Sequence, residues 1–99
     1  MEVNQLQREI AKFSAKWDKK RKTKPTEQAT LIHIVEEIGE LASQYVNLNS
    51  RKSRYDAKEL ENAIGDALMQ LVVLADLRGL DIEKMVIKII KDEEKQFKL

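Results

Sequence analysis

Apolar side chains recur three and four positions apart along almost the whole chain, and this spacing constrains the fold more than any other feature. The first segment has apolar residues at positions 3, 6, 10, 13 and 17, and three later segments repeat the pattern. A helix turns by about 100° per residue, so this spacing gathers apolar side chains on one face. No segment alternates apolar and polar residues as a half-buried strand does. The pattern predicts an all-α chain of four helices.

Capping residues mark where these helices begin and end. The first helix ends in the basic run 19–22, which suits the negative end of the helix dipole. Pro25 is favourable at the first position of a helix, so a second helix of about six turns is expected from there. Asp56 and Asp81 are expected N-caps of the third and fourth helices. Gly79 predicts the C-terminal end of the third helix.

Length and connections predict the architecture. The 99 residues indicate one domain, residues 1–99. Four helices with short connections favour an antiparallel, four-helix bundle-like chain. A chain of this size buries only about 60–68% of its unfolded surface. Completion by oligomerisation is therefore expected.

Composition narrows the class of protein. The chain contains no cysteine, which excludes disulfides and thiol chemistry. The net charge of +1 argues neither for nor against a nucleic-acid partner, and such a partner is not expected. The N-terminus is polar, and the longest apolar run is too short to span a membrane. A soluble, cytoplasmic protein without a membrane partner is expected.

Acidic residues gather on one side of the second predicted helix. Glu36, Glu37 and Glu40 fall within an arc of about 100°, and His33 points into the same arc. Like charges at this spacing repel each other. A solvated helix face tolerates that repulsion, whereas a divalent cation would turn the same residues into a binding site.

A second stretch repeats part of the first. Gly65-Asp66 echoes Gly39-Glu40, and each pair lies within an apolar helical pattern. Glycine inside a helix costs about 0.5–1 kcal/mol relative to alanine. The repetition predicts that two helix backbones approach closely there. If the helices pack antiparallel, Glu37, Glu40 and Asp66 face a common point.

Together these stretches resemble the MazG family of all-α nucleoside triphosphate pyrophosphohydrolases. The family signature is Glu-Glu-x-x-Glu on one helix and Glu-x-x-Asp on the next. Residues 36–40, Glu-Glu-Ile-Gly-Glu, match the first half completely. Residues 63–66, Ala-Ile-Gly-Asp, lie at the right distance for the second half, but Ala63 replaces the glutamate. The lead-in at residues 24–27 and Trp17 also resemble family features.

The resemblance implies a reaction, a cofactor and a set of catalytic residues. Family members cleave an NTP or dNTP between the α and β phosphates, with Mg²⁺ as cofactor, giving the monophosphate and pyrophosphate. Carried over residue by residue, Glu37, Glu40 and Asp66 are metal ligands. Glu36 is a further ligand or orients the attacking water. The family forms dimers or dimers of dimers, so a homodimer or homotetramer is expected.

Three further residues are candidates for substrate binding. Trp17 offers an indole face on which a base can stack, although packing in the core explains it equally well. Lys16 belongs to a basic segment that either ends a solvated helix or holds the triphosphate. Asn62 shares a face with Asp66 and is expected to reach sugar or phosphate.

The substitution at Ala63 leaves alternatives open. Glu59 and Asn62 point within about 40° of Asp66 and are candidates to compensate for the missing ligand. Otherwise the chain is a catalytically weakened nucleotide-binding or regulatory protein. A helical interaction module using the basic residues 19–24 and 51–54 is the third reading. A single histidine argues against a di-iron bundle, and no Gly-x-x-x-x-Gly-Lys loop occurs.

Overall fold

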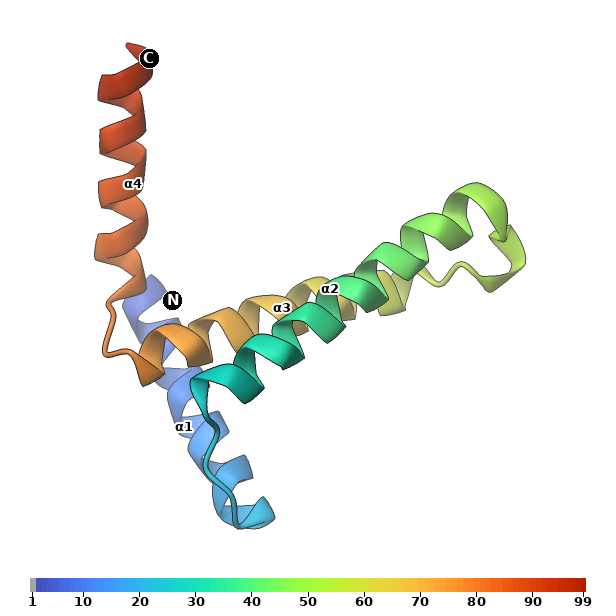
Figure 1. Cartoon of the computed structure of the whole chain (residues 1–99), viewed down its shortest axis with the longest axis horizontal. Helices are drawn as coiled ribbons and strands as arrows, with labels where there is room; N and C mark the ends of the chain where they lie inside the picture. Colours follow the sequence, from blue (N-terminus) through green and yellow to red (C-terminus); the bar gives the residue numbers. More distant parts are fainter. Residues whose placement is uncertain (1) are drawn as a thin grey trace.

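The computed structural model describes residues 2–99, of which 85% are helical, with four α-helices and no strand. The helices are α1 (Val3–Arg21), α2 (Glu27–Ser50), α3 (Ala57–Leu77) and α4 (Ile82–Phe97), and a short 3₁₀ helix, η1 (Lys52–Arg54), lies between α2 and α3. The all-α prediction is confirmed. Figure 1 shows the order of these elements along the chain.

Side chains at the helix starts act as the sequence predicts. The Asp56 carboxylate accepts hydrogen bonds from the backbone N–H groups of Lys58 and Glu59, at 2.9 and 3.2 Å. Asp81 accepts one from the N–H of Lys84 at 3.0 Å. These bonds satisfy donors that have no partner within the helix. The expected N-caps of α3 and α4 are therefore confirmed.

The start of α2 differs slightly from the expectation, whereas the end of α3 agrees with it. Helix α2 begins at Glu27, two residues after the expected first residue Pro25, and Thr26 caps it: the Thr26 hydroxyl accepts a hydrogen bond from the N–H of Ala29 at 3.0 Å. Gly79 follows α3 with a φ of +67°, in the left-handed region that glycine enters without strain. The expected end of α3 at this glycine is confirmed.

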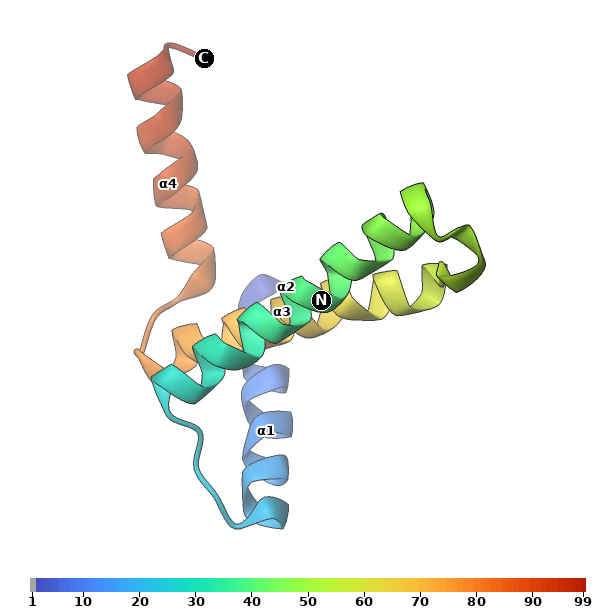
Figure 2. The same ribbon diagram turned by 45° about the vertical axis from the view of Figure 1, so that its right-hand side comes forward.

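Helices α2 and α3 form a long antiparallel hairpin (Figures 1 and 2). At one end, Arg78 Nη1 forms an ion pair with Glu27 Oε1 at 2.8 Å. At the other end, the buried Gln44 side chain holds the turn. Its Oε1 accepts from the N–H of Asp56 at 2.9 Å, and its Nε2 donates to Glu59 Oε2 at 3.3 Å. Both ends of the hairpin are thus fixed by polar contacts.

Helix α1 crosses α3 and makes the small apolar core of the chain. Ile10 of α1 is buried against Val72 and Val73, with Met69 and Ile82 packed around them. This crossing places the middle of α1 beside the last turns of α3, and the C-terminal half of α1 extends away from the hairpin (Figure 1).

Helix α4 extends away from the hairpin and packs against α1 (Figures 1 and 2). The Gln7 side chain fixes the turn before it. Its Nε2 donates to the Leu80 carbonyl at 2.8 Å, and its Oε1 accepts from the N–H of Ile82 at 3.1 Å. No residue of α4 is buried, so the helix presents an apolar stripe to its surroundings.

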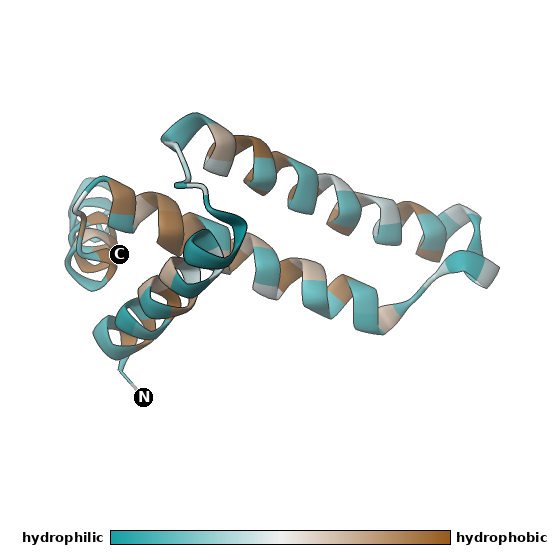
Figure 3. Cartoon of the chain, turned by 90° about the horizontal axis from the view of Figure 1, so that it is seen from below, coloured by the Kyte–Doolittle hydropathy of each residue, from teal (hydrophilic) through white to brown (hydrophobic). Residues whose placement is uncertain are grey.

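The chain is open in shape and leaves large apolar side chains uncovered. Its radius of gyration is 16.4 Å, against about 13 Å for a compact domain of 100 residues. On the hairpin, Val35 is 62% exposed and Leu68 is 53% exposed. Figure 3 shows that apolar and polar residues are interspersed along α2 and α3. We call the following exposed set the apolar face: Leu31, Val35, Ile38, Ile64, Leu68 and Leu71.

The close backbone approach predicted at Gly39 and Gly65 is wrong within this chain. A Cβ atom added at either glycine would meet no atom within 4 Å. The reason is helical geometry: the glycines point about 140–160° away from the residues buried between α2 and α3, Ile34 and Ala67. In the described part of the chain, no helix is long and apolar enough to cross a membrane.

Candidate functional site

A groove of about 480 Å³ runs between α2 and α3 and contains two of the four acids predicted as catalytic, Glu40 and Asp66. We call it the carboxylate groove. By helical geometry it lies on the side of the hairpin opposite the apolar face. Its lining residues are Glu40, Ser43, Gln44, Glu59, Asn62, Ala63 and Asp66. The structure therefore brings Glu40 and Asp66 together, as antiparallel packing predicts.

Glu37 lies beside these two acids and is held in an unfavourable environment. Burial of its carboxyl raises the pKa of Glu37, and the negative charges of Glu40 and Asp66 raise it further. His33, one turn earlier, opposes the shift and lowers this pKa. Among residues 2–99, the buried Oε2 atom of Glu37 has no hydrogen-bond partner. A buried carboxylate oxygen without a partner is costly unless a positive group pairs with it.

The residues present fit an oxygen-ligated divalent cation. In the region that the structure describes, no three Asp, Glu or His side chains converge into a ready-made metal cage. Mg²⁺ does not require one, because it is usually held by one or two carboxylates together with waters and substrate phosphates. The unpartnered Glu37 oxygen, with Glu40 and Asp66 near it, supplies that kind of donor set.

Ala63 lies in the wall of the carboxylate groove, where the family motif has glutamate. It is only 3% exposed and sits where α3 packs against α2. Glu59 and Asn62, the candidates to compensate, line the same groove. Glu59 is also held in place by the hydrogen bond from Gln44. An alternative acid is therefore present in the groove that Ala63 lines.

Sequence reasoning missed Gln44 and Ser43 as members of the groove. Gln44 lies four residues after Glu40, which places it about 40° away on the same helix face. The helical spacing that groups the glutamates thus includes Gln44 one turn further on. Its uncharged side chain gave no other signal.

Other predicted residues lie outside the groove lining. Glu36 is exposed, one turn before Glu40 on α2. Trp17 is 42% exposed on α1, with the Phe13 ring edge-on at 6.3 Å. Lys20 and Arg21 lie over its ring, at 5.7 and 5.2 Å from the centroid. The catalytic role of Glu36 and the substrate-binding roles of Trp17, Lys16 and Asn62 stay predictions.

Comparison with known families agrees with the motif. The model of the MazG nucleotide pyrophosphohydrolase domain matches residues 25–96. The matched range contains α2, α3 and all but the last residue of α4, and it includes every residue of the carboxylate groove. Neither the search of curated proteins nor the search of solved structures gave a match.

Proposed function

We propose, since this chain belongs to the MazG nucleotide pyrophosphohydrolase domain family, that it is a Mg²⁺-dependent nucleoside triphosphate pyrophosphohydrolase. It cleaves NTP or dNTP between the α and β phosphates and releases the monophosphate and pyrophosphate. The observation that carries the proposal is the buried, unpartnered oxygen of Glu37 beside Glu40 and Asp66.

In this proposal the residues of the carboxylate groove and the acids beside it have different roles. Glu37, Glu40 and Asp66 hold the cation. Mg²⁺, when bound, neutralises the triphosphate and helps to generate a hydroxide nucleophile. Glu36, exposed one turn before Glu40, orients the attacking water. Asn62 contacts sugar or phosphate from the opposite wall.

A second copy of the chain is the partner that we propose for the apolar face. The face lies opposite the carboxylate groove, so a partner helix pair can cover it while the groove stays open. Exposed apolar patches of this kind mark interaction surfaces. The result is a homodimer, or a homotetramer if α4 adds a further contact.

The test is pyrophosphate release from a panel of NTPs and dNTPs, with and without Mg²⁺. We expect metal-dependent release that falls by about a hundredfold in Glu40→Gln, because several kcal/mol of charge stabilisation is lost. Glu61→Gln, an exposed change on α3 outside the groove, is the matched control. If no nucleotide is cleaved under any condition, the proposal fails.

A second candidate, favoured by Ala63, is nucleotide binding with weakened turnover. The alanine removes the ligand that the family motif supplies from this turn of α3. In this case Ala63→Glu raises turnover strongly, whereas Ala63→Gln, similar in size but uncharged, does not. An active wild type that gains nothing from Ala63→Glu contradicts this candidate.

A further inference from the structure

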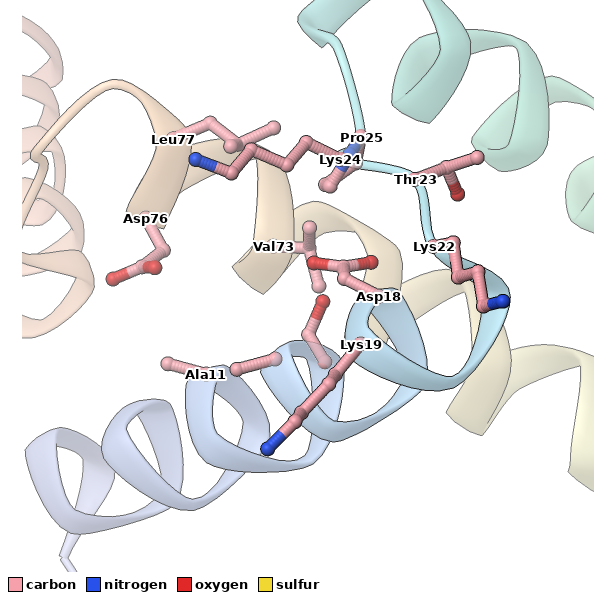
Figure 4. Close-up of a pocket in the computed structure, with 12 residues that line it drawn as sticks. Ala11, Asp18, Lys19, Lys22, Thr23, Lys24, Pro25, Val73, Asp76 and Leu77 are labelled. Atoms are coloured by element: carbon pink, nitrogen blue, oxygen red, sulfur yellow. The ribbon is translucent and has the colours of Figure 1, made fainter.

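A second cavity, of about 580 Å³, lies where α1, the linker 22–25 and the last turns of α3 meet (Figure 4). We call it the α1–α3 cavity. Its walls are mainly small and apolar, formed by Ala11, Ala15, Pro25, Val73 and Leu77. A cavity of this size with apolar walls and a few polar groups is the usual form of a small-molecule site.

Seven polar or charged residues complete the lining and give the cavity its chemistry. They are Ser14, Asp18, Lys19, Lys22, Thr23, Lys24 and Asp76. In Figure 4 the Asp18 carboxylate faces the space beside Val73, and the Lys24 side chain extends along the rim toward Leu77. Among residues 2–99, the ion pairs are Lys12–Glu9, Arg78–Glu27 and Lys88–Asp92. The Asp18 carboxylate is in none of these pairs and has its acceptor oxygens available to a ligand.

The α1–α3 cavity lies on the same side of α3 as the carboxylate groove. Val73 and Leu77 follow Asp66 by seven and eleven residues, so each points within about 20° of the direction of Asp66. Along the helix axis, Val73 is about 10 Å from Asp66. One elongated ligand can therefore reach from the cavity to the groove along α3.

We propose that the α1–α3 cavity binds the nucleoside of the substrate, with Asp18 selecting guanine. This inference rests on the proposed function, in which the triphosphate lies in the carboxylate groove. The apolar walls accept the base and ribose, and the carboxylate reads the edge of the base.

The choice of guanine follows from the hydrogen-bonding groups of the bases. A carboxylate only accepts hydrogen bonds, and its two oxygens match two adjacent donors. Guanine presents such a pair, its N1–H and its N2 amino group. Uracil and thymine present a single N–H between two carbonyl oxygens, which repel a carboxylate. The Lys24 ammonium on the rim is a donor for the guanine O6.

In this proposal the base does not stack on Trp17, the residue that the sequence indicates as a candidate for base stacking. Trp17 does not line the α1–α3 cavity, and its direction on α1 differs from that of Asp18 by about 100°. The chain has a single tryptophan, so a change in its fluorescence reports on the surroundings of that position alone.

The test uses nucleosides, which lack phosphate and so do not depend on metal or hydrolysis. Calorimetry of the full chain with guanosine, adenosine, cytidine and uridine measures the order of affinity. We expect guanosine to bind tightest and uridine weakest. Asp18→Asn is expected to weaken guanosine binding about tenfold, the effect of losing one bidentate contact. Asp92→Asn, on exposed α4, is the matched control.

Each outcome decides for or against the cavity. Guanosine-dependent shifts of the Val73 methyl signals in NMR spectra, lost in Asp18→Asn, support it. Equal binding of all four nucleosides, no binding, or an unchanged affinity in Asp18→Asn overturns it. Quenching of Trp17 fluorescence without shifts at Val73 places the base on Trp17 and also overturns it.

The same samples separate this inference from the proposed function. Selective guanosine binding without pyrophosphate release from any nucleotide supports the nucleoside site in the α1–α3 cavity and contradicts the proposed pyrophosphohydrolase activity. Metal-dependent pyrophosphate release without Asp18-dependent base selection supports the proposed pyrophosphohydrolase activity and contradicts the nucleoside site in the α1–α3 cavity.

Discussion

One side of the α2–α3 hairpin carries Glu40, Glu59 and Asp66, and the opposite side carries Val35 and Leu68. Both sides come from the same two helices, and the 100° turn per residue separates them. Each side is incomplete in a single chain, but for different reasons. The acidic side gathers negative charges that repel one another, and the apolar side exposes large side chains to solvent. One sequence pattern therefore encodes two surfaces of opposite chemistry on the same helix pair.

Loss of self-association is the largest effect that we expect. Leu68→Glu places a charge at the centre of the apolar face, where a second copy would have to desolvate it. We expect association to weaken about a hundredfold or more, measured by sedimentation equilibrium over a range of protein concentrations. Lys58→Glu, which adds the same side chain at an exposed position of α3, should leave association unchanged. A monomeric wild type at all concentrations would show that the apolar face has no second copy as its partner.

The next largest effect concerns the turn that joins the two helices. Gln44→Ala removes a buried side chain that accepts from the Asp56 N–H and donates to Glu59. Leaving the N–H without a partner costs about 1–3 kcal/mol. The melting temperature should then fall by about 4–8 °C for each kcal/mol. Gln28→Ala, an exposed change on the same helix, is the control. An unchanged melting temperature for Gln44→Ala would mean that water replaces the amide without loss.

The part of the fold that depends on local rules was predictable from the sequence. Asp56, Asp81 and Gly79 act at the helix ends as their chemistry requires, and the number of helices follows from the apolar spacing. The proximity of Glu40 and Asp66 was predictable as well, because antiparallel packing brings the acidic faces of α2 and α3 to the same side of the hairpin. These features need only the geometry of one helix or of one helix pair.

The remaining features depend on how the helices are placed in space. Spacing assigns apolar positions to α4 but does not say that this helix packs against α1 instead of the hairpin. Gly39 does not mark a contact with α3, because its position on the helix points away from α3. The α1–α3 cavity requires the crossing of α1 over α3, which no single motif encodes.

A pH dependence follows from the environment of Glu37. Folding raises the pKa of this carboxyl, so the folded state binds its proton more tightly than the unfolded state does. The free energy of unfolding therefore falls as the pH rises from below the ordinary value of 4.5 through the raised pKa. Glu37→Gln removes this fall and is expected to be more stable than wild type at neutral pH. Urea denaturation across this pH range measures both effects.

The effect of Mg²⁺ on the free energy of unfolding provides a further test of Glu37. A cation that binds only the folded state stabilises it, and it does so best when Glu37 is deprotonated. We expect added Mg²⁺ to raise the wild-type stability at neutral pH and to have less effect on Glu37→Gln. Glu36→Gln, exposed and adjacent in sequence, should keep the wild-type pH dependence. Equal stabilisation of wild type and Glu37→Gln would place the cation elsewhere.

The smallest expected effect tests the boundary between the two sides of the hairpin. Gly39 sits in α2 with open space where a Cβ would be, so Gly39→Ala should stabilise the single chain by about 0.5–1 kcal/mol through helix propensity. Thermal melting of a dilute sample measures this gain. Between two copies the outcome differs if the glycine permits close approach, because the added methyl would then weaken association. If Gly39→Ala stabilises the chain and leaves its self-association in sedimentation unchanged, the contact between copies is confined to the apolar face. A stabilised chain that associates less tightly extends that contact to Gly39, and the close approach expected from the sequence then lies between copies.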